Sequence, residues 1–113
     1  MRNSVLLAVM VFVTTMSTEQ FAAGERDKFV LAIDCGTESA RVGIFSSSDG
    51  KLVSTSSCKY ATNFPRPGWA EQAPEEWWTS LGTASRTAVD QLKALLGEEA
   101  PDIVAIGMDT TGR

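Results

Sequence analysis

The segment from Asp34 to Arg41, with the sequence DCGTESAR, gathers side chains that could bind a phosphate group and a metal ion. A turn rich in glycine and hydroxyl residues exposes consecutive backbone N–H groups, and such a concavity binds anions. Gly36 has no Cβ, so a ligand can approach the backbone closely at this point. The hydroxyls of Thr37 and Ser39 could donate hydrogen bonds to phosphate oxygens.

Charged residues at the two ends of this turn complete the candidate site. The Asp34 carboxylate could hold Mg²⁺, in part through water, because Mg²⁺ retains much of its hydration shell. Arg41 carries a permanent charge on a planar fork that suits phosphate or carboxylate. An ordinary hairpin is the alternative, since D-x-G-T-x-S is made of common turn residues. The predicted phosphate-binding set is Asp34, Gly36, Thr37, Ser39 and Arg41, with Asp34 also as the metal ligand.

Apolar runs on both sides of the turn predict strands. Residues 29–34 are almost wholly apolar, as in a strand that is buried on both faces. Residues 40–46 follow the turn, and Asp49-Gly50 then predicts a tight hairpin. Residues 51–59 read as a third strand with one polar face. Three strands joined by short links predict an antiparallel meander.

A helix and a fourth strand are predicted further along the chain. Pro74 suits the first helical position, and Gly97 suits the residue after the helix. Apolar residues recur at three-four spacing, and we expect them in the core: Trp77, Trp78, Leu81, Ala84, Ala88, Leu92, Leu95 and Leu96. Residues 102–109 predict a fourth buried strand.

The fourth strand should lie beside the first strand and parallel to it, because a strand–helix–strand connection normally makes a right-handed parallel crossover. The first strand ends at Asp34 and the fourth at Asp109. Ligands of such sheets bind outside the carboxyl ends of the parallel strands. We therefore expect these two carboxylates to face one cleft.

Length, charge and composition exclude several functional classes. With 113 residues the chain forms one domain at most. The net charge is −4 and no lysine or arginine cluster occurs, which argues against nucleic-acid binding. The chain has no histidine, so a histidine-activated nucleophile and a histidine metal site are excluded. Cys35 and Cys58 are expected to be buried or half-buried free thiols rather than a disulfide framework.

The N-terminal segment, residues 1–28, differs from the rest and is expected to be a signal-like or disordered extension. Residues 5–13 form an apolar run of nine, which is too short for a membrane-spanning helix. This run matches the apolar part of a secretory signal, which would extend over residues 1–17. Alternatively, residues 1–15 are an upstream extension before a cytosolic start at Met16. A cytoplasmic location is expected if the phosphate-binding turn serves a nucleotide, because nucleotides are supplied in the cytosol.

Three segments resemble those of a known family. DCGTESARVGIF resembles the phosphate-binding hairpin of the sugar-kinase, Hsp70 and actin superfamily. FPRPGWAEQAPEEWW resembles the P-G-W-x-E-x-x-P-x-x-x-W signature of FGGY carbohydrate kinases, and IVAIGMDTTG resembles the family's fourth strand, with a D-T-T-G ending most similar to ribulokinase. The resemblance implies an α/β fold in which residues 29–113 form part of an N-terminal domain. That part would be the start of an actin-like, ribonuclease H-like ATPase lobe, with a β-β-β-α-β mixed sheet.

The resemblance also implies a reaction, the Mg²⁺-dependent transfer of the γ-phosphoryl group of ATP to a hydroxyl of a pentulose or a related sugar or polyol. Asp34, Gly36 and Thr37 match the family's ATP phosphate loop, and Arg41 matches an arginine of the next strand. The loop that lines the sugar cleft is matched by Asp109, Thr110 and Thr111. The aspartate that acts as general base lies later in family members, so no catalytic residue is predicted here. The chain by itself is expected to be inactive.

Some alternatives stay open. The chain could be a non-catalytic phosphate-binding, nucleotide-binding or interaction module with the same fold start, or a small secreted domain if residues 1–15 are a signal. Trp69 and Glu71 match family positions, but a structural clamp around the prolines is the favoured interpretation. Ala73 stands where the family commonly has an aspartate that would cap the helix. The implied partners are a sugar and ATP, and whether the full-length protein is a homo-oligomer is open.

Overall fold

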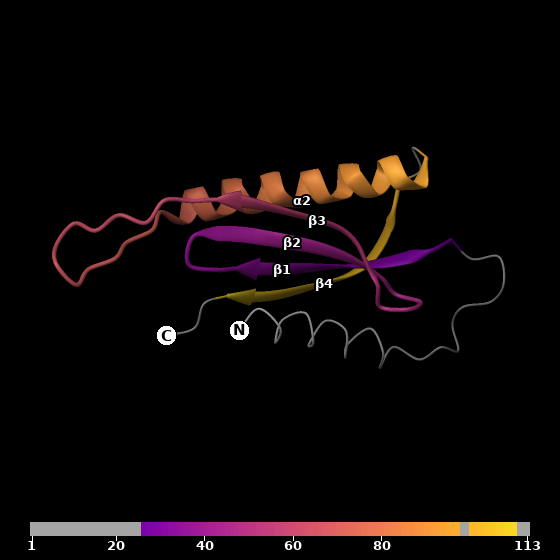
Figure 1. The fold of residues 1–113 in the computed structure, drawn as a ribbon, viewed down its shortest axis with the longest axis horizontal. Coiled ribbons are helices and arrows are strands. Elements are labelled where there is room, and N and C mark those ends of the chain that lie inside the picture. Colours follow the sequence, from indigo (N-terminus) through magenta and orange to yellow (C-terminus); the bar gives the residue numbers. More distant parts are fainter. Residues whose placement is uncertain (1–25, 98–99, 111–113) are drawn as a thin grey trace.

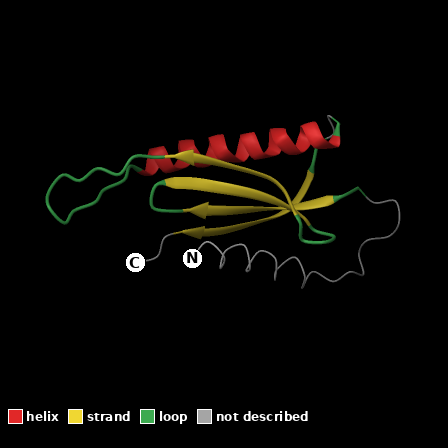
Figure 2. Ribbon diagram, in the orientation of Figure 1, coloured by secondary structure: helices red, strands yellow, loops and turns green. Residues whose placement is uncertain are grey.

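The computed structural model describes residues 26–97 and 100–110, which form a four-stranded sheet with one long helix along one face (Figures 1 and 2). The elements in chain order are β1 (Lys28–Cys35), β2 (Ser39–Ser46), β3 (Leu52–Lys59), α2 (Pro74–Leu96) and β4 (Asp102–Thr110). Most of the N-terminal extension predicted over residues 1–28, and Thr111 of the predicted sugar loop, lie outside the described residues.

The sheet has the strand order β3-β2-β1-β4. Strand β2 pairs antiparallel with β1 and with β3, which confirms the predicted meander. Strand β4 pairs with β1 in parallel, which confirms the predicted crossover through the helix. The turn between β2 and β3 contains Gly50 at φ 70°, a conformation that the Asp-Gly pair predicted.

The main core lies between the sheet and α2. Phe29, Leu31 and Ile33 of β1 face the helix, and Val30 and Ala32 lie on the other face, where they pack with Phe45. All five β1 residues are buried, as expected for a strand covered on both sides. The helix contributes small side chains at its closest approach: Ala84 and Ala88 are fully buried, and Ser54 Oγ of β3 donates a hydrogen bond to the Ala88 carbonyl at 2.9 Å.

The predicted burial of the helix was correct in its middle and wrong at two places. Trp77 packs against the core, but Trp78 is 77% exposed. Successive helical residues point about 100° apart, since a turn has 3.6 residues, so only one of the two indoles can face the sheet. Leu95 and Leu96 in the last turn are exposed as well, so the buried stripe ends at Leu92.

The prediction of a fourth buried strand was also wrong, because β4 is an edge strand. Val104, Ile106 and Met108 are 42%, 68% and 58% exposed. The helix packs on β3 and β2 and reaches β1 only marginally. Within the described residues the helix therefore leaves the apolar face of β4 uncovered.

The ends of α2 follow the sequence signals. Pro74 is the first helical residue, and Gly97 adopts φ 76° and ψ 57° while its N–H donates to the Lys93 carbonyl. The N-cap residue is Ala73, which makes no side-chain capping bond. The helix therefore begins without the side-chain acceptor that usually satisfies its first N–H groups.

Candidate phosphate-binding site

A row of polar residues crosses all four strands near the β1–β2 turn. Ser57 pairs with Arg41, Arg41 with Asp34, and Asp34 with Asp109. The neighbours of Arg41 in β2, Ala40 and Val42, belong to the core under the helix. Because side chains alternate along a strand, the row lies on the opposite face of the sheet. The predicted proximity of the two aspartates is therefore confirmed at the level of strand register.

The Arg41 guanidinium lies close to Asp34 and to Gly36. Its Nε lies 3.7 Å from Oδ2 of Asp34, and both side chains are partly exposed. A Cβ placed on Gly36 would lie 2.9 Å from Nη2 of Arg41. Gly36 has no positive φ, so the absence of a side chain at this position serves the close approach of the guanidinium.

A groove of about 550 Å³ opens beside this turn. Its lining residues are Thr37, Glu38, Ser39, Arg41, Ser57 and Lys59. Three of the predicted phosphate-binding residues therefore share one groove, whereas Asp34 and Gly36 are not among the residues that line it. Ser57 and Lys59 were not singled out from the sequence, although the polar alternation of residues 51–59 could have pointed to them. Arg41 and Lys59 together give the groove two cationic side chains and several hydroxyls, a set suited to an anion.

The two aspartates offer oxygen ligands of the kind that Mg²⁺ prefers. Asp109 is exposed, and its Oδ1 accepts the N–H of Thr110 at 2.9 Å. Within residues 26–97 and 100–110 no group of three or more potential metal-ligating side chains occurs. The donor set thus fits an ion held by one or two carboxylates together with phosphate and water, which is the usual form of a Mg²⁺-nucleotide site.

Side chains from outside the hairpin support the β1–β2 turn. The hydroxyl of Tyr60 donates to the Gly36 carbonyl, and Nε2 of Gln72 donates to the Thr37 carbonyl at 2.6 Å. Trp77 Nε1 donates to Oε1 of Gln72 at 3.0 Å, and the centre of its ring lies 5.8 Å from the centre of the Tyr60 ring.

The Tyr60 phenol stays protonated and can therefore donate. Burial raises its pKa, and the nearby Cys35 and Asp34 raise it to a smaller extent. Tyr60 and Gln72 were not singled out from the sequence as supports of this turn.

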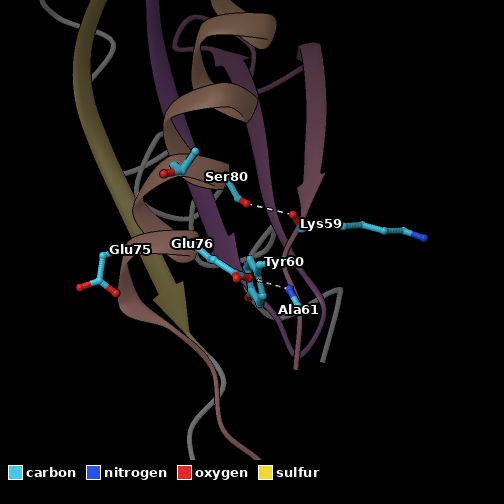
Figure 3. A pocket seen from close by; sticks show the side chains of 7 residues that line it. Lys59, Tyr60, Ala61, Glu75, Glu76 and Ser80 are labelled. Carbon is cyan, nitrogen blue, oxygen red and sulfur yellow. Dashed lines mark hydrogen bonds between the residues drawn. The ribbon is translucent and has the colours of Figure 1, made fainter. Parts of the chain in front are cut away.

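A second cavity, of about 600 Å³, lies at the start of α2 and is lined in part by Glu75 and Glu76 (Figure 3). Its polar groups mainly join the helix to the end of β3. Glu76 Oε2 accepts the N–H of Ala61 at 3.0 Å, and Ser80 Oγ donates to the Lys59 carbonyl at 2.9 Å. The Lys59 side chain extends away from the other labelled side chains. These contacts give the cavity a structural role.

The two ends of the proline-rich segment between β3 and α2 are joined by backbone hydrogen bonds. Asn63 and Glu71 exchange two backbone hydrogen bonds of 2.8 Å. The Arg66 guanidinium lies 4.6 Å from the centre of the Trp69 ring, a cation–π distance. Glu71 therefore acts through its backbone and Trp69 through a local contact, as the clamp interpretation expects.

Comparison with known proteins identifies the family. Residues 29–113 match the model of the N-terminal domain of the FGGY family of carbohydrate kinases. The chain belongs to this family. It is 40% identical over 80 residues to a glycerol kinase of Rhodopseudomonas palustris (strain BisA53), a match that covers 71% of this chain and 15% of the relative. A glycerol kinase of Thermococcus onnurineus (strain NA1) is 35% identical over 82 residues, covering 73% and 16%.

Solved structures agree with the assignment to an FGGY kinase domain. A xylulose kinase from Rhodospirillum rubrum superposes with a TM-score of 0.59 at 27% identity, over 75% of this chain and 17% of that one. A Plasmodium falciparum glycerol kinase with ADP gives a TM-score of 0.62 at 24% identity, over 74% and 16%, and supports the fold. The FGGY chain thus spans 15% or 16% of the length of the curated relatives described above.

The fold class predicted from the sequence is confirmed. The mixed four-stranded sheet with its helix matches the N-terminal lobe of actin-like sugar kinases. In the described part of the chain no helix is long and apolar enough to cross a membrane. Cys35 and Cys58 are free thiols, buried and half-buried, as expected.

Proposed function

We propose that this chain supplies the nucleotide-phosphate turn and one wall of the sugar cleft of an ATP-dependent sugar kinase. The observation that carries the proposal is the row in which Arg41, Asp34 and Asp109 are register partners at the carboxyl ends of the parallel strands β1 and β4. In such sheets this edge is where ligands bind. Residues 29–113 would be the opening part of the N-terminal domain, and residues 1–28 an extension without a part in the site.

The nucleotide phosphates would bind at the β1–β2 turn. Thr37 and Ser39 would donate hydroxyl hydrogen bonds, and Arg41 would pair with phosphate oxygens from the groove that these residues line. Asp34 would hold Mg²⁺ with the phosphates, and the ion would neutralise part of their charge during phosphoryl transfer. Lys59, which lines the same groove, adds a second cation.

The sugar would lie on the β4 side of the row. Asp109 and Thr110 are exposed at the end of β4, where their oxygens could accept hydrogen bonds from hydroxyl groups. Thr111 follows them in the chain. The acceptor that we propose is a pentulose or a related sugar or polyol, because the D-T-T-G ending is most similar to ribulokinase. Glycerol kinases and xylulose kinases among the relatives support this class of substrate. We place the reaction in the cytoplasm, where ATP is supplied.

The chain by itself should not catalyse the reaction. Phosphoryl transfer depends on positioning and on a site that excludes water, and the groove here is open. Purified chain, incubated with Mg·ATP and D-ribulose, D-xylulose or glycerol, should form no sugar phosphate. ATP-dependent phosphorylation that disappears in Asp34→Ala would contradict this expectation.

Nucleotide binding tests the role of the turn separately from catalysis. Titration with Mg·ATP should shift the amide NMR signals of Thr37 and Glu38, and Arg41→Gln should weaken the binding. Arg86→Gln, an exposed arginine on α2, is the matched control and should bind as the parent does. Binding with Arg41-dependent shifts but no turnover would also be the outcome for a non-catalytic nucleotide-binding module. Equal shifts in all three proteins would contradict the proposed phosphate site.

A further inference from the structure

Two carbonyl groups of the β1–β2 turn accept hydrogen bonds from side chains that lie far along the chain. The Tyr60 hydroxyl donates to the Gly36 carbonyl, and the next carbonyl, of Thr37, accepts Nε2 of Gln72 at 2.6 Å. Thr62 Oγ1 approaches the same Thr37 carbonyl at 3.4 Å. Tyr60 and Thr62 follow β3, whereas Gln72 lies just before α2. Both ends of the proline-rich segment therefore hold the turn.

Holding these carbonyls also orients the amides that follow them. The C=O of one residue and the N–H of the next share a planar trans peptide and point in opposite directions. The N–H groups of Thr37 and Glu38 must therefore point away from Tyr60 and Gln72. Among the described residues, neither amide donates to a protein acceptor. Two consecutive amides thus face outward together, an arrangement that binds anions.

Trp77 determines which way the Gln72 amide is turned. An indole N–H can only donate, so it requires the oxygen of Gln72, which it meets at 3.0 Å. The amide nitrogen then faces the turn, where it donates one hydrogen to the Thr37 carbonyl, with an N···O distance of 2.6 Å, and the other to Thr62 Oγ1, with an N···O distance of 2.7 Å. Both groups of the Gln72 side chain are therefore used, and only a side chain with one acceptor and one donor at this length can reproduce the arrangement.

We propose that Gln72 is a positioning residue, which fixes the β1–β2 turn so that the Thr37 and Glu38 amides point toward the phosphates. The functional part of this inference rests on the proposed phosphate site, and the structural part does not. The hydrogen bonds of the Gln72 side chain among the described residues go to the Thr37 carbonyl, Thr62 and Trp77, and none goes to a side chain that lines the groove. The segment that carries it, which resembles the family's P-G-W signature, thereby gains a role at the nucleotide turn.

Two backbone amides that are hydrogen-bonded within the turn can report on its order. The Gly36 N–H donates to the Ser39 carbonyl at 2.9 Å, and the Tyr60 N–H donates to the Glu38 carbonyl at 3.1 Å. Both bonds depend on the conformation of the turn.

Hydrogen-exchange protection of the Gly36 and Tyr60 amides is measured by NMR in the full chain for Gln72→Met and Gln72→Glu. Gln91→Met and Gln91→Glu, at an exposed position of α2, are the matched controls. Loss of the Gln72 bonds should lower protection of Gly36 and Tyr60 by about three- to ten-fold, in line with the net contribution of a hydrogen bond. Protection of the Leu31 and Ile33 amides should not change.

The pH dependence of Gln72→Glu separates the hydrogen bond from simple loss of packing. An ionised carboxylate can accept from Trp77 but cannot donate to Thr37. A protonated carboxyl group can do both, and glutamate side chains have an ordinary pKa of about 4.3. Protection of Gly36 in Gln72→Glu should therefore recover as pH falls below about 4. Gln72→Met should show no recovery, and Gln91→Glu should follow the parent chain at every pH.

Titration of the same proteins with Mg·ADP then tests the functional part. If the parent chain binds, Gln72→Met should weaken binding several-fold while Gln91→Met does not. Unchanged protection at Gly36 and Tyr60 overturns the proposal. Reduced protection with unchanged Mg·ADP affinity also overturns it, because Gln72 would then have a structural role alone. If the parent does not bind Mg·ADP, the proposed nucleotide function of the chain fails, and the exchange data still decide whether Gln72 positions the turn.

Discussion

A Cβ on Gly36 would lie 2.9 Å from Nη2 of Arg41, a distance at which one of the two must move. The guanidinium is the part that can move, because it is the far end of a flexible side chain. Arg41 is also held at 3.7 Å from the Asp34 carboxylate. The glycine of this turn therefore determines where the cation beside the predicted metal ligand lies, rather than supplying an unusual backbone conformation.

Gly36→Ala should displace the Arg41 guanidinium with little effect on stability. The free energy of unfolding, from urea denaturation, should change by less than about 1 kcal/mol because only a flexible side chain has to shift. Mg·ATP binding, followed by NMR, should weaken, and the Arg41 Nε–H signal should move. A drop of several kcal/mol, or an unchanged Arg41 signal, would contradict this account.

Gly82→Ala, the matched substitution in the helix, should raise the stability of the chain. Gly82 lies inside α2, and the three atoms nearest to its added Cβ would all belong to the flexible Arg86 side chain, the nearest at 3.3 Å. Alanine loses less backbone entropy than glycine in a helix, so stability should rise by about 0.5–1 kcal/mol. Urea denaturation measures the change, and a loss of stability would mean that the helix cannot accept a side chain here.

Ala73→Asp should stabilise the chain. Ala73 is the N-cap of α2 and makes no side-chain capping bond. An aspartate can accept a hydrogen bond from an N–H of the first turn, and such caps contribute about 1 kcal/mol. The gain should appear as a higher denaturation midpoint with an unchanged slope, and it should shrink as the aspartate is protonated at low pH. A gain that persists in the protonated state would have another origin.

Alkaline pH should destabilise the chain through Cys35 and Tyr60. Burial, with the nearby Asp34 as the smaller cause, raises the pKa of the Cys35 thiol above its ordinary 9.0, and burial chiefly raises the pKa of Tyr60 above 10.0. A raised folded-state pKa means that the stabilisation is complete below the unfolded value and is lost as pH rises through the folded value. Thermal melts should therefore shift downward above about pH 9. Cys35→Ala should show a shallower decline, and equal slopes would contradict the assignment.

Ala88→Leu should be the most destabilising of these substitutions. Ala88 is fully buried where α2 meets the sheet, and its carbonyl accepts the Ser54 hydroxyl. Three extra carbons have no space there, and overpacking of this kind costs about 1–3 kcal/mol. Thr87→Leu, at an exposed position of the same helix, is the control and should change stability little. If both variants melt alike, the close helix–sheet contact is looser than described.

The local sequence was sufficient to predict the strands, the helix and the parallel crossover. Apolar continuity marked Phe29 to Ile33 as a buried strand, and Pro74 and Gly97 marked the ends of the helix, because these signals act within a few residues. The crossover followed from chirality, which admits one common solution. From that topology the pairing of Asp34 with Asp109 could be predicted before any coordinates.

The exposure of Trp78 and of the apolar residues of β4 could not be predicted in the same way. Apolar residues in 102–109 and at position 78 carry no information about which surface the helix covers. That coverage depends on where α2 crosses the sheet, which is over β2 and β3. Val104, Ile106 and Met108 therefore remain exposed in the described part of the chain although their sequence is that of a core strand.

The sequence by itself determined the chemistry available at the turn: an aspartate, a glycine without a Cβ, two hydroxyls and an arginine within eight residues. Only the tertiary structure decided how that turn is held and what lines its groove. Lys59 comes into the groove because it pairs with Ser39 across strands. Gln72 reaches the Thr37 carbonyl across 35 positions of the chain. Contacts of this kind depend on which segments pack together, a property of the whole fold, and no local pattern encodes them.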